Sequence, residues 1–124
     1  GELGTYYFNN HFNIQGLKSD DVYEGEKTDK PEMIAFTSNI KHEICKKLNL
    51  SSGIPGAKEG KIPKLPDEAI NLAKSNNDVF YEPTNNIYTL GDEKTPELNG
   101  QPSGCVQIGT EQPVFVYYHT LLAN

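Results

Sequence analysis

The segment GCVQIGTEQPVFVYYHTLL, residues 104–122, holds the densest run of β-forming residues in the chain. Valine, isoleucine, phenylalanine and tyrosine favour strands because their branched or aromatic side chains pack well on a pleated surface. A polar stretch from Gly109 to Gln112 divides the segment and is typical of a tight turn. The segment therefore predicts two strands joined as a hairpin. The first of them carries Cys105, one of two cysteines in the chain.

The length and composition predict one domain that spans residues 1–124. Only 35% of the residues are hydrophobic, so the core is thin, and the 7 tyrosines and 5 phenylalanines form much of it. The net charge of −6 argues against a nucleic-acid partner and against an anionic membrane surface. Lys41, Lys46 and Lys47 form the basic cluster that the sequence shows, and they are typical of a solvated helix face.

The two cysteines, Cys45 and Cys105, lack CxxC spacing, which argues against a zinc site and against a thioredoxin-like redox pair. A structural disulfide between them is the favoured interpretation, and two buried free thiols are the alternative. In the chain-entropy model a loop of this length contributes about 4 kcal/mol, a large share of the stability of a small domain. Asn49-Leu50-Ser51 matches an N-glycosylation sequon, but such triplets occur often by chance.

The clearest helix signal runs over residues 38–48, with a capping side chain available from residues 37–39. Three apolar residues recur at four-residue intervals, namely Ile40, Ile44 and Leu48. Cys45 lies beside Ile44 on the same side of this helix. We expect this face to pack on the sheet, with Cys45 tying the helix to the first strand of the C-terminal hairpin.

The remaining segments predict short strands and one further short helix. Residues 33–36 form either a strand or a lead-in that packs against the next element, and strands are expected at residues 6–8, 11–14, 78–82 and 87–90. The first two should form a hairpin around Asn9-Asn10, and the last two a hairpin around residues 83–86. A second helix should open at Pro66 and stop at Ser75, between loops over residues 51–66 and 91–104. The pattern predicts an α+β fold with short helices on one face of an antiparallel sheet.

The sequence predicts no catalytic, cofactor-binding or metal-binding residues, and hence no enzyme. Its three histidines lie at no metal-ligand spacing and are expected to be hydrogen-bonded or solvated: His11, His42 and His119. The acidic stretches at residues 20–26 and 92–93 lack the register of a calcium loop, so solvated loops are favoured over weak calcium sites. A hydrolase is disfavoured because no nucleophile–base pair can be named, and Cys105 has a second cysteine as its better partner.

Tyrosines occur in adjacent pairs at residues 6–7 and 117–118. Adjacent residues of a strand point to opposite faces of the sheet, so one tyrosine of each pair should belong to the core. The other should be exposed or at a subunit interface, where tyrosine is common. The same alternation places His119 on one side with Phe115, Tyr117 and Leu121.

Several segments carry a family resemblance: NIQGL at 13–17, MIAF at 33–36, IKHEICKKLN at 40–49, NGQPSGC at 99–105 and VYYHTLL at 116–122. In this order they resemble the C-terminal half of alphaproteobacterial pilin-like proteins, of type IV prepilin or pseudopilin type. The resemblance spans most of the chain, from about Tyr6 to the end. None of the segments is a catalytic motif, so the resemblance points to a family more than to an activity.

The resemblance implies a soluble pilin-like head in the periplasm or at the cell surface, and it supports the disulfide of Cys45 with Cys105. Family members also have an apolar N-terminal helix, which does not appear before Thr5, and the membrane would be reached only through that helix. The implied function is a non-enzymatic structural or interaction subunit of a pilus or secretion apparatus. Its partners would be other pilin-like subunits or secretion-apparatus proteins. The alternative is a stand-alone secreted binding module, such as an adhesin, receptor-binding or inhibitor domain.

Overall fold

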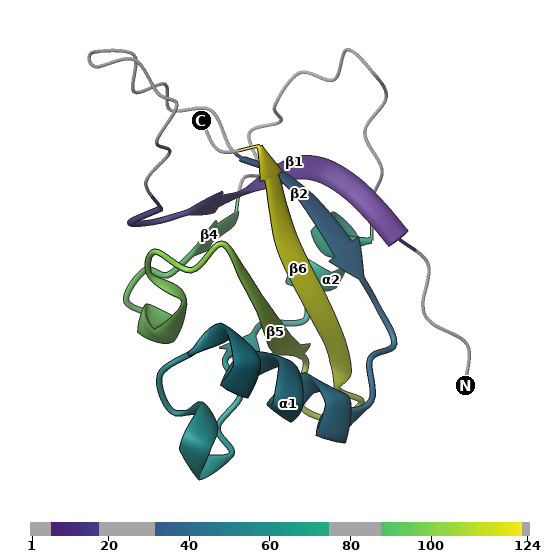
Figure 1. The fold of residues 1–124 in the computed structure, drawn as a ribbon. Helices are drawn as coiled ribbons and strands as arrows, with labels where there is room; N and C mark the ends of the chain where they lie inside the picture. Colours follow the sequence, from purple (N-terminus) through teal and green to yellow (C-terminus); the bar gives the residue numbers. More distant parts are fainter. Residues whose placement is uncertain (1–5, 18–31, 75–87, 123–124) are drawn as a thin grey trace.

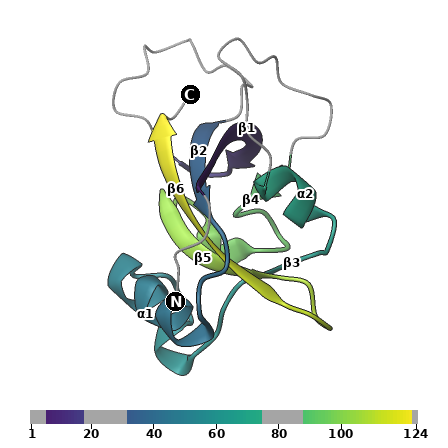
Figure 2. The same cartoon turned by 90° about the vertical axis from the view of Figure 1, so that its right-hand side faces the viewer.

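The computed structural model describes residues 6–17, 32–74 and 88–122, and it has the expected α+β class. A mixed sheet lies between helix α1 on one side and helix α2 on the other, as Figures 1 and 2 show. In chain order the elements are β1 (Tyr6–Ile14), β2 (Glu32–Thr37), α1 (His42–Ser52), η1 (Ala57–Glu59), β3 (Lys64–Leu65), α2 (Ala69–Ala73), β4 (Tyr88–Leu90), η2 (Pro96–Leu98), β5 (Ser103–Ile108) and β6 (Val114–Leu122).

The sheet has the strand order β3-β5-β6-β2-β1-β4. Its central strands β5, β6, β2 and β1 are antiparallel to one another. The short outer strands run parallel to their neighbours, β3 beside β5 and β4 beside β1. The antiparallel prediction is therefore right for the centre of the sheet and wrong at both edges. The expected partner strand at residues 78–82 lies outside the described residues.

The C-terminal hairpin is confirmed as the pair β5 and β6. Its register runs from Ser103 opposite His119 to Ile108 opposite Val114. The strand β6 continues the sheet by pairing with β2 on its other side. The hairpin thus joins two parts of the molecule. Its strand β6 pairs with β2, and its strand β5 carries most of the contacts with α1.

Residues 6–14 form the single strand β1, so the predicted hairpin around Asn9-Asn10 is wrong. The pairing of β1 with β2 shifts register there, because Asn9 opposes Ile34 while Phe12 opposes Glu32. One extra residue on β1 is the geometry of a β-bulge, which disrupts the alternation of faces. Polar residues and an interrupted alternation are typical of a turn as well as of a bulge. At Asn9-Asn10 they mark a bulge.

The main hydrophobic core lies between the sheet and α2. Its sheet residues alternate along the central strands: Phe12, Ile14, Ile34, Phe36, Val106, Ile108, Val116 and Tyr118. Helix α2 contributes the buried Ala69 and Ala73, whose small side chains let the helix lie close to the strands. The predicted helix after Pro66 is thus present, although it begins at Ala69 after a turn.

The two helices cover opposite faces of the sheet, so the expectation of helices on one face is wrong. Figure 2 shows α1 on the left and α2 on the right with the strands between them. The disulfide joins α1 to Cys105, whose neighbour Val106 points into the core on the α2 side. Adjacent residues of a strand face opposite sides of the sheet. The six-residue strand β5 therefore contacts α1 on one side and contributes to the core on the α2 side.

Helix α1 begins at His42 and ends at Ser52, four residues later at each end than predicted. Asn39 has a φ of 58°, a left-handed conformation that cannot continue into a helix from residue 38. The next residue is still attached to the sheet, since the Ile40 amide donates to the Phe115 carbonyl at 3.0 Å. The chain therefore leaves the sheet only after Ile40.

Two segments of the family resemblance meet beyond the end of β1. The Gly100 amide donates to the Gln15 carbonyl at 2.8 Å, and the Asn99 side chain donates to the Gly91 carbonyl at 3.1 Å. Gly91 has a φ of 84°, and a Cβ there would lie 2.8 Å from the backbone of Asn99. These residues hold the long loop against the end of β1, which is a structural role.

Candidate functional site

The disulfide between Cys45 and Cys105 is confirmed, with an S–S distance of 2.09 Å and a Cα–Cα distance of 5.4 Å. Both residues are fully buried, and neither is a free thiol. The alternative of two buried free thiols is therefore wrong. Structural disulfides form and persist in oxidising compartments, so the bond indicates that the chain folds in one.

Asn49 adds a second attachment at the same point of β5. Its amide donates to the Cys105 carbonyl at 2.9 Å and accepts from the Cys105 amide at 2.7 Å. It lies one helical turn after Cys45, so both side chains reach the same strand residue. The Asn49 side chain pairs with the strand backbone as a neighbouring strand would. The sequon is therefore a structural element in the folded protein, because its asparagine is fully buried and its amide is bonded.

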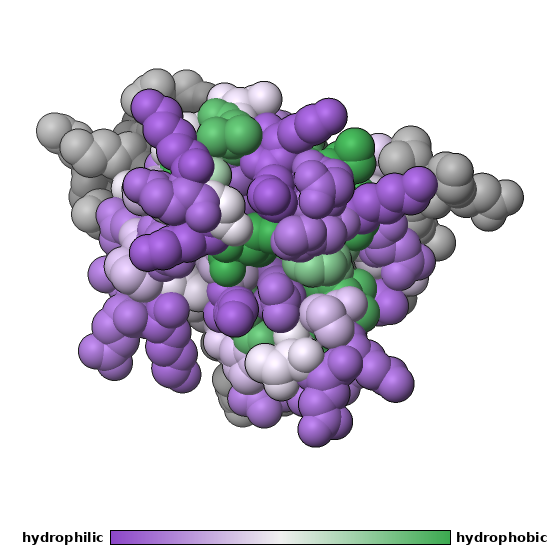
Figure 3. Space-filling view, turned by 90° about the horizontal axis from the view of Figure 1, so that it is seen from below, coloured by the Kyte–Doolittle hydropathy of each residue, from purple (hydrophilic) through white to green (hydrophobic). Residues whose placement is uncertain are grey.

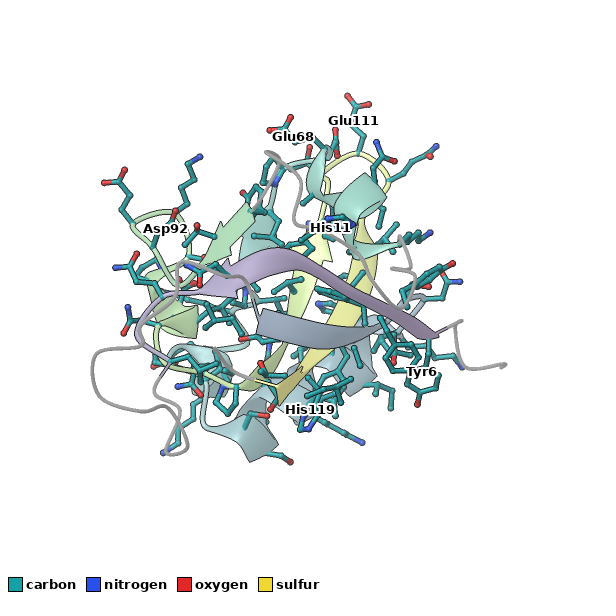
Figure 4. The ribbon with its side chains drawn as sticks, turned by 90° about the horizontal axis from the view of Figure 1, so that it is seen from above. Tyr6, His11, Glu68, Asp92, Glu111 and His119 are labelled. Carbon is teal, nitrogen blue, oxygen red and sulfur yellow. A yellow bond between two sulfur atoms is a disulfide. The ribbon has the colours of Figure 1, made fainter. Side chains whose placement is uncertain are left out.

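The face of the sheet that α1 partly covers is open over β6 and β1. We define the open face by the residues Tyr6, Phe8, Tyr117, His119 and Leu121. The exposed fractions of Tyr6, Phe8 and Leu121 are 54%, 46% and 52%. The rings of Tyr6 and Phe8 stack with centroids 6.5 Å apart. Figure 4 shows Tyr6 and His119 on one side of the sheet and His11 on the other.

The predicted division of each tyrosine pair between the core and the outside is correct at residues 117–118. Tyr118 is fully buried, and its hydroxyl donates to the Gln101 carbonyl at 2.9 Å. Burial raises the pKa of the Tyr118 hydroxyl far above its ordinary value. Tyr117, on the opposite side of β6, remains part-exposed on the open face.

The predicted apolar face of α1 is wrong at Ile44, whose side chain is 44% exposed. The buried residues of the helix are Cys45 and Asn49. Their bonds to Cys105 fix the rotation of the helix about its axis, and successive residues differ by about 100° around it. Asn49 lies on the flank of α1 that faces the β3–β5 edge of the sheet. Ile44 lies on the other flank of the helix, so its side chain projects away from that edge.

A cavity of about 470 Å³ lies on another part of the surface. Its lining combines cationic, polar and apolar residues: His42, Gly60, Lys61, Ile62, Lys64, Lys94, Glu97 and Gln107. Figure 3 views the molecule from below, where α1 and the following turns lie, and shows mainly hydrophilic side chains around smaller hydrophobic patches. The sequence did not predict this lysine group, because its members come from segments that only the fold brings together.

A second, smaller cavity of about 330 Å³ lies between α2 and the β5–β6 turn. Asp67 and Glu111 bring carboxylates to it beside Ile70, Ile108 and Val114, and Figure 4 shows Glu68 and Glu111 at the same end of the molecule. Within residues 6–17, 32–74 and 88–122, no group of three or more His, Cys, Asp or Glu side chains could hold a metal ion.

The three histidines occupy separate places. His11 is buried on the α2 side, and desolvation lowers its pKa. His42 starts α1, where its ring lies 5.1 Å from that of Phe115 and its Nδ1 lies 3.6 Å from a Glu43 carboxylate oxygen. His119 is exposed on the open face. They do not form a common catalytic arrangement.

The acidic doublet Asp92-Glu93 belongs to a turn in which an Asp92 carboxylate oxygen accepts from the Lys94 amide at 3.0 Å. The acidic stretch at residues 20–26 lies outside the described residues. Of the helices described, none is long and apolar enough to cross a membrane.

Comparison with known proteins finds no matching protein family, no similar curated protein and no similar solved structure.

Proposed function

We propose that this protein is a non-enzymatic structural or interaction subunit, the soluble head of a pilin-like or pseudopilin-like protein of a pilus or secretion apparatus. It would act in the periplasm or at the cell surface. The observation that carries this proposal is the open face, where aromatic and aliphatic side chains are half exposed on regular strands. Several exposed apolar side chains on one face of a sheet typically mark a contact site, and tyrosine and phenylalanine are enriched at interfaces.

The occupant that we propose is an apolar helix of a neighbouring pilin-like subunit. Helix α1 packs over β5 and β6 on this face, whereas β2 and β1 continue the sheet beyond it. Strands lie about 4.8 Å apart and a helix is about 10 Å across, so the uncovered part has the width of one further helix. A helix placed there would lie alongside α1.

Ile44 supports this arrangement, because it projects from α1 away from the sheet edge and is half exposed. A helix on the open face would contact Ile44 from one side and Phe8 or Leu121 from below. Burying the exposed part of each such side chain would contribute about 1 kcal/mol, so several together give a stable contact. The exposed apolar side chains Phe8, Ile44 and Leu121 would then be buried in an interface between subunits.

Site-specific photocrosslinking tests the contact. A photoreactive phenylalanine analogue replaces Phe8 in the producing organism, and Lys74, exposed at the end of α2, receives the same analogue as a control. We expect the Phe8 position to crosslink to a peptide from the apolar helix of a pilin-like subunit, and the Lys74 position not to do so. A Phe8 crosslink only to a secreted protein without such a helix would favour the stand-alone binding module instead. Equal crosslinking at both positions would contradict the proposal.

The coding sequence upstream of Gly1 gives an independent test. A pilin-like subunit should encode a short basic leader followed by an apolar helix of about 20 residues. An ordinary cleaved signal peptide directly before the head would contradict the pilin-like assignment and leave a secreted binding module.

A further inference from the structure

We propose that the lysine-lined cavity binds a small oxyanion that carries two or more negative charges, through phosphate or carboxylate groups. The residues that carry the proposal are Lys61, Lys64 and Lys94, all of which line the same cavity. This site is separate from the open face, so it does not depend on the proposed pilin-like function.

The charge of this cavity is opposite to that of the molecule. The chain has a net charge of −6, all 11 of its cationic residues other than histidine are lysines, and three of these line one cavity. Among the described residues of the lining, Glu97 is the one carboxylate, so the lysines outnumber it. In the part of the chain that the structure describes, the side-chain contact of salt-bridge length is that of His42 with Glu43, and none of the three lysines makes one. No carboxylate of the described residues therefore lies within salt-bridge distance of these ammonium groups.

The backbone that carries two of the lysines is ordered, and all three side chains are exposed. Lys64 lies on β3, where it pairs with Gln107 of β5, and both residues line the cavity. The stem of Lys61 passes close to Gly56, where an added Cβ would lie 3.4 Å from the Lys61 Cβ. An ordered backbone keeps the starting points of these side chains together, so a ligand has to order only the lysine side chains themselves.

The ligand class follows from the lining and the size. A lysine ammonium acts as a compact point charge that suits phosphate and carboxylate oxygens. The cavity is shallow and open to solvent, and its volume of about 470 Å³ leaves room for a small molecule at the surface. Ile62 adds an apolar wall, and Glu97 can accept a hydrogen bond from a hydroxyl or amine of the ligand.

Isothermal titration calorimetry with the whole 124-residue chain tests the proposal. Inorganic pyrophosphate and citrate serve as separate probes at constant ionic strength. We expect saturable binding of at least one, and the stronger probe indicates whether phosphate or carboxylate is preferred. Binding should weaken about tenfold or more in K61Q/K64Q, because two charge-assisted contacts are lost. The matched variant K58Q/K74Q changes the net charge equally outside the cavity and should bind as the unmodified chain does.

Two carboxylate variants provide a second measurement, in which the expected change in affinity is opposite to that of the lysine variant. Glu97→Gln removes the negative charge from the cavity and should strengthen binding, whereas Glu111→Gln makes the same change at the other cavity and should not. The absence of saturable heat with both probes would overturn the proposal. Equal effects of the two lysine pairs, or of the two carboxylate variants, would also overturn it, because they would show a response to net charge alone.

Discussion

At the scale of single residues, Asn49 determines how α1 meets the sheet. Its side chain satisfies both backbone groups of the fully buried Cys105. We predict that Asn49→Ala lowers the free energy of unfolding by about 3 kcal/mol, because it leaves a buried amide and a buried carbonyl without partners. Urea denaturation followed by circular dichroism measures this change.

Ser51→Ala is the matched control, since it also removes the sequon but changes an exposed residue. It should alter the free energy of unfolding by less than about 0.5 kcal/mol. Similar losses in both variants would show that the hydrogen bonds of Asn49 are not the cause. The sequon Asn49-Leu50-Ser51 does not by itself distinguish a glycan site from a structural asparagine. The structural role depends on the contact of Asn49 with Cys105, which is distant in sequence.

At the scale of elements, α1 starts without a capping side chain. Its N-cap is Lys41, in an extended conformation and with no side-chain hydrogen bond to the first turn. A lysine there also brings a positive charge to the positive end of the helix dipole. We predict that Lys41→Ser raises the free energy of unfolding by about 1 kcal/mol. Lys47→Ser, an exposed change within the same helix, should lower it slightly, by about 0.5 kcal/mol. Equal effects of the two variants would contradict a capping role.

The sequence predicted most elements but not how they are rotated or bounded. The strand and helix patterns located β2, β5, β6 and the middle of α1, because local propensity and periodicity act over a few residues. The choice of Ile44 as a buried residue was wrong, since the disulfide and Asn49 fix the rotation of α1 through contacts distant in sequence. In the sequence the bulge in β1 resembles a turn, because both use polar residues and interrupt the alternation.

At the scale of the whole molecule, the parts that the sequence missed all depend on topology. The strand expected at residues 87–90 is present as β4, but its parallel pairing with β1 does not follow from the sequence, and the two-residue strand β3 is too short for any periodicity. The lysine cavity collects residues from α1, the segment between η1 and β3, β3, the segment around η2, and β5, which no local pattern relates. The Cys45–Cys105 disulfide was predictable because only one pairing of two cysteines exists.

That disulfide carries the last prediction, because it closes a loop with a sequence separation of 60 residues and encloses β3, α2 and β4. In the chain-entropy model, a cross-link that closes a loop of this length lowers the entropy of the unfolded chain and so raises the free energy of unfolding by about 4 kcal/mol. A small domain has a total stability of about 5–15 kcal/mol, so the double variant Cys45→Ala/Cys105→Ala should be only marginally stable. Replacing both cysteines avoids a reactive single thiol, and urea denaturation of the two proteins measures the difference. A loss below about 1 kcal/mol would mean that Asn49 and the helix contacts hold α1 without the bond.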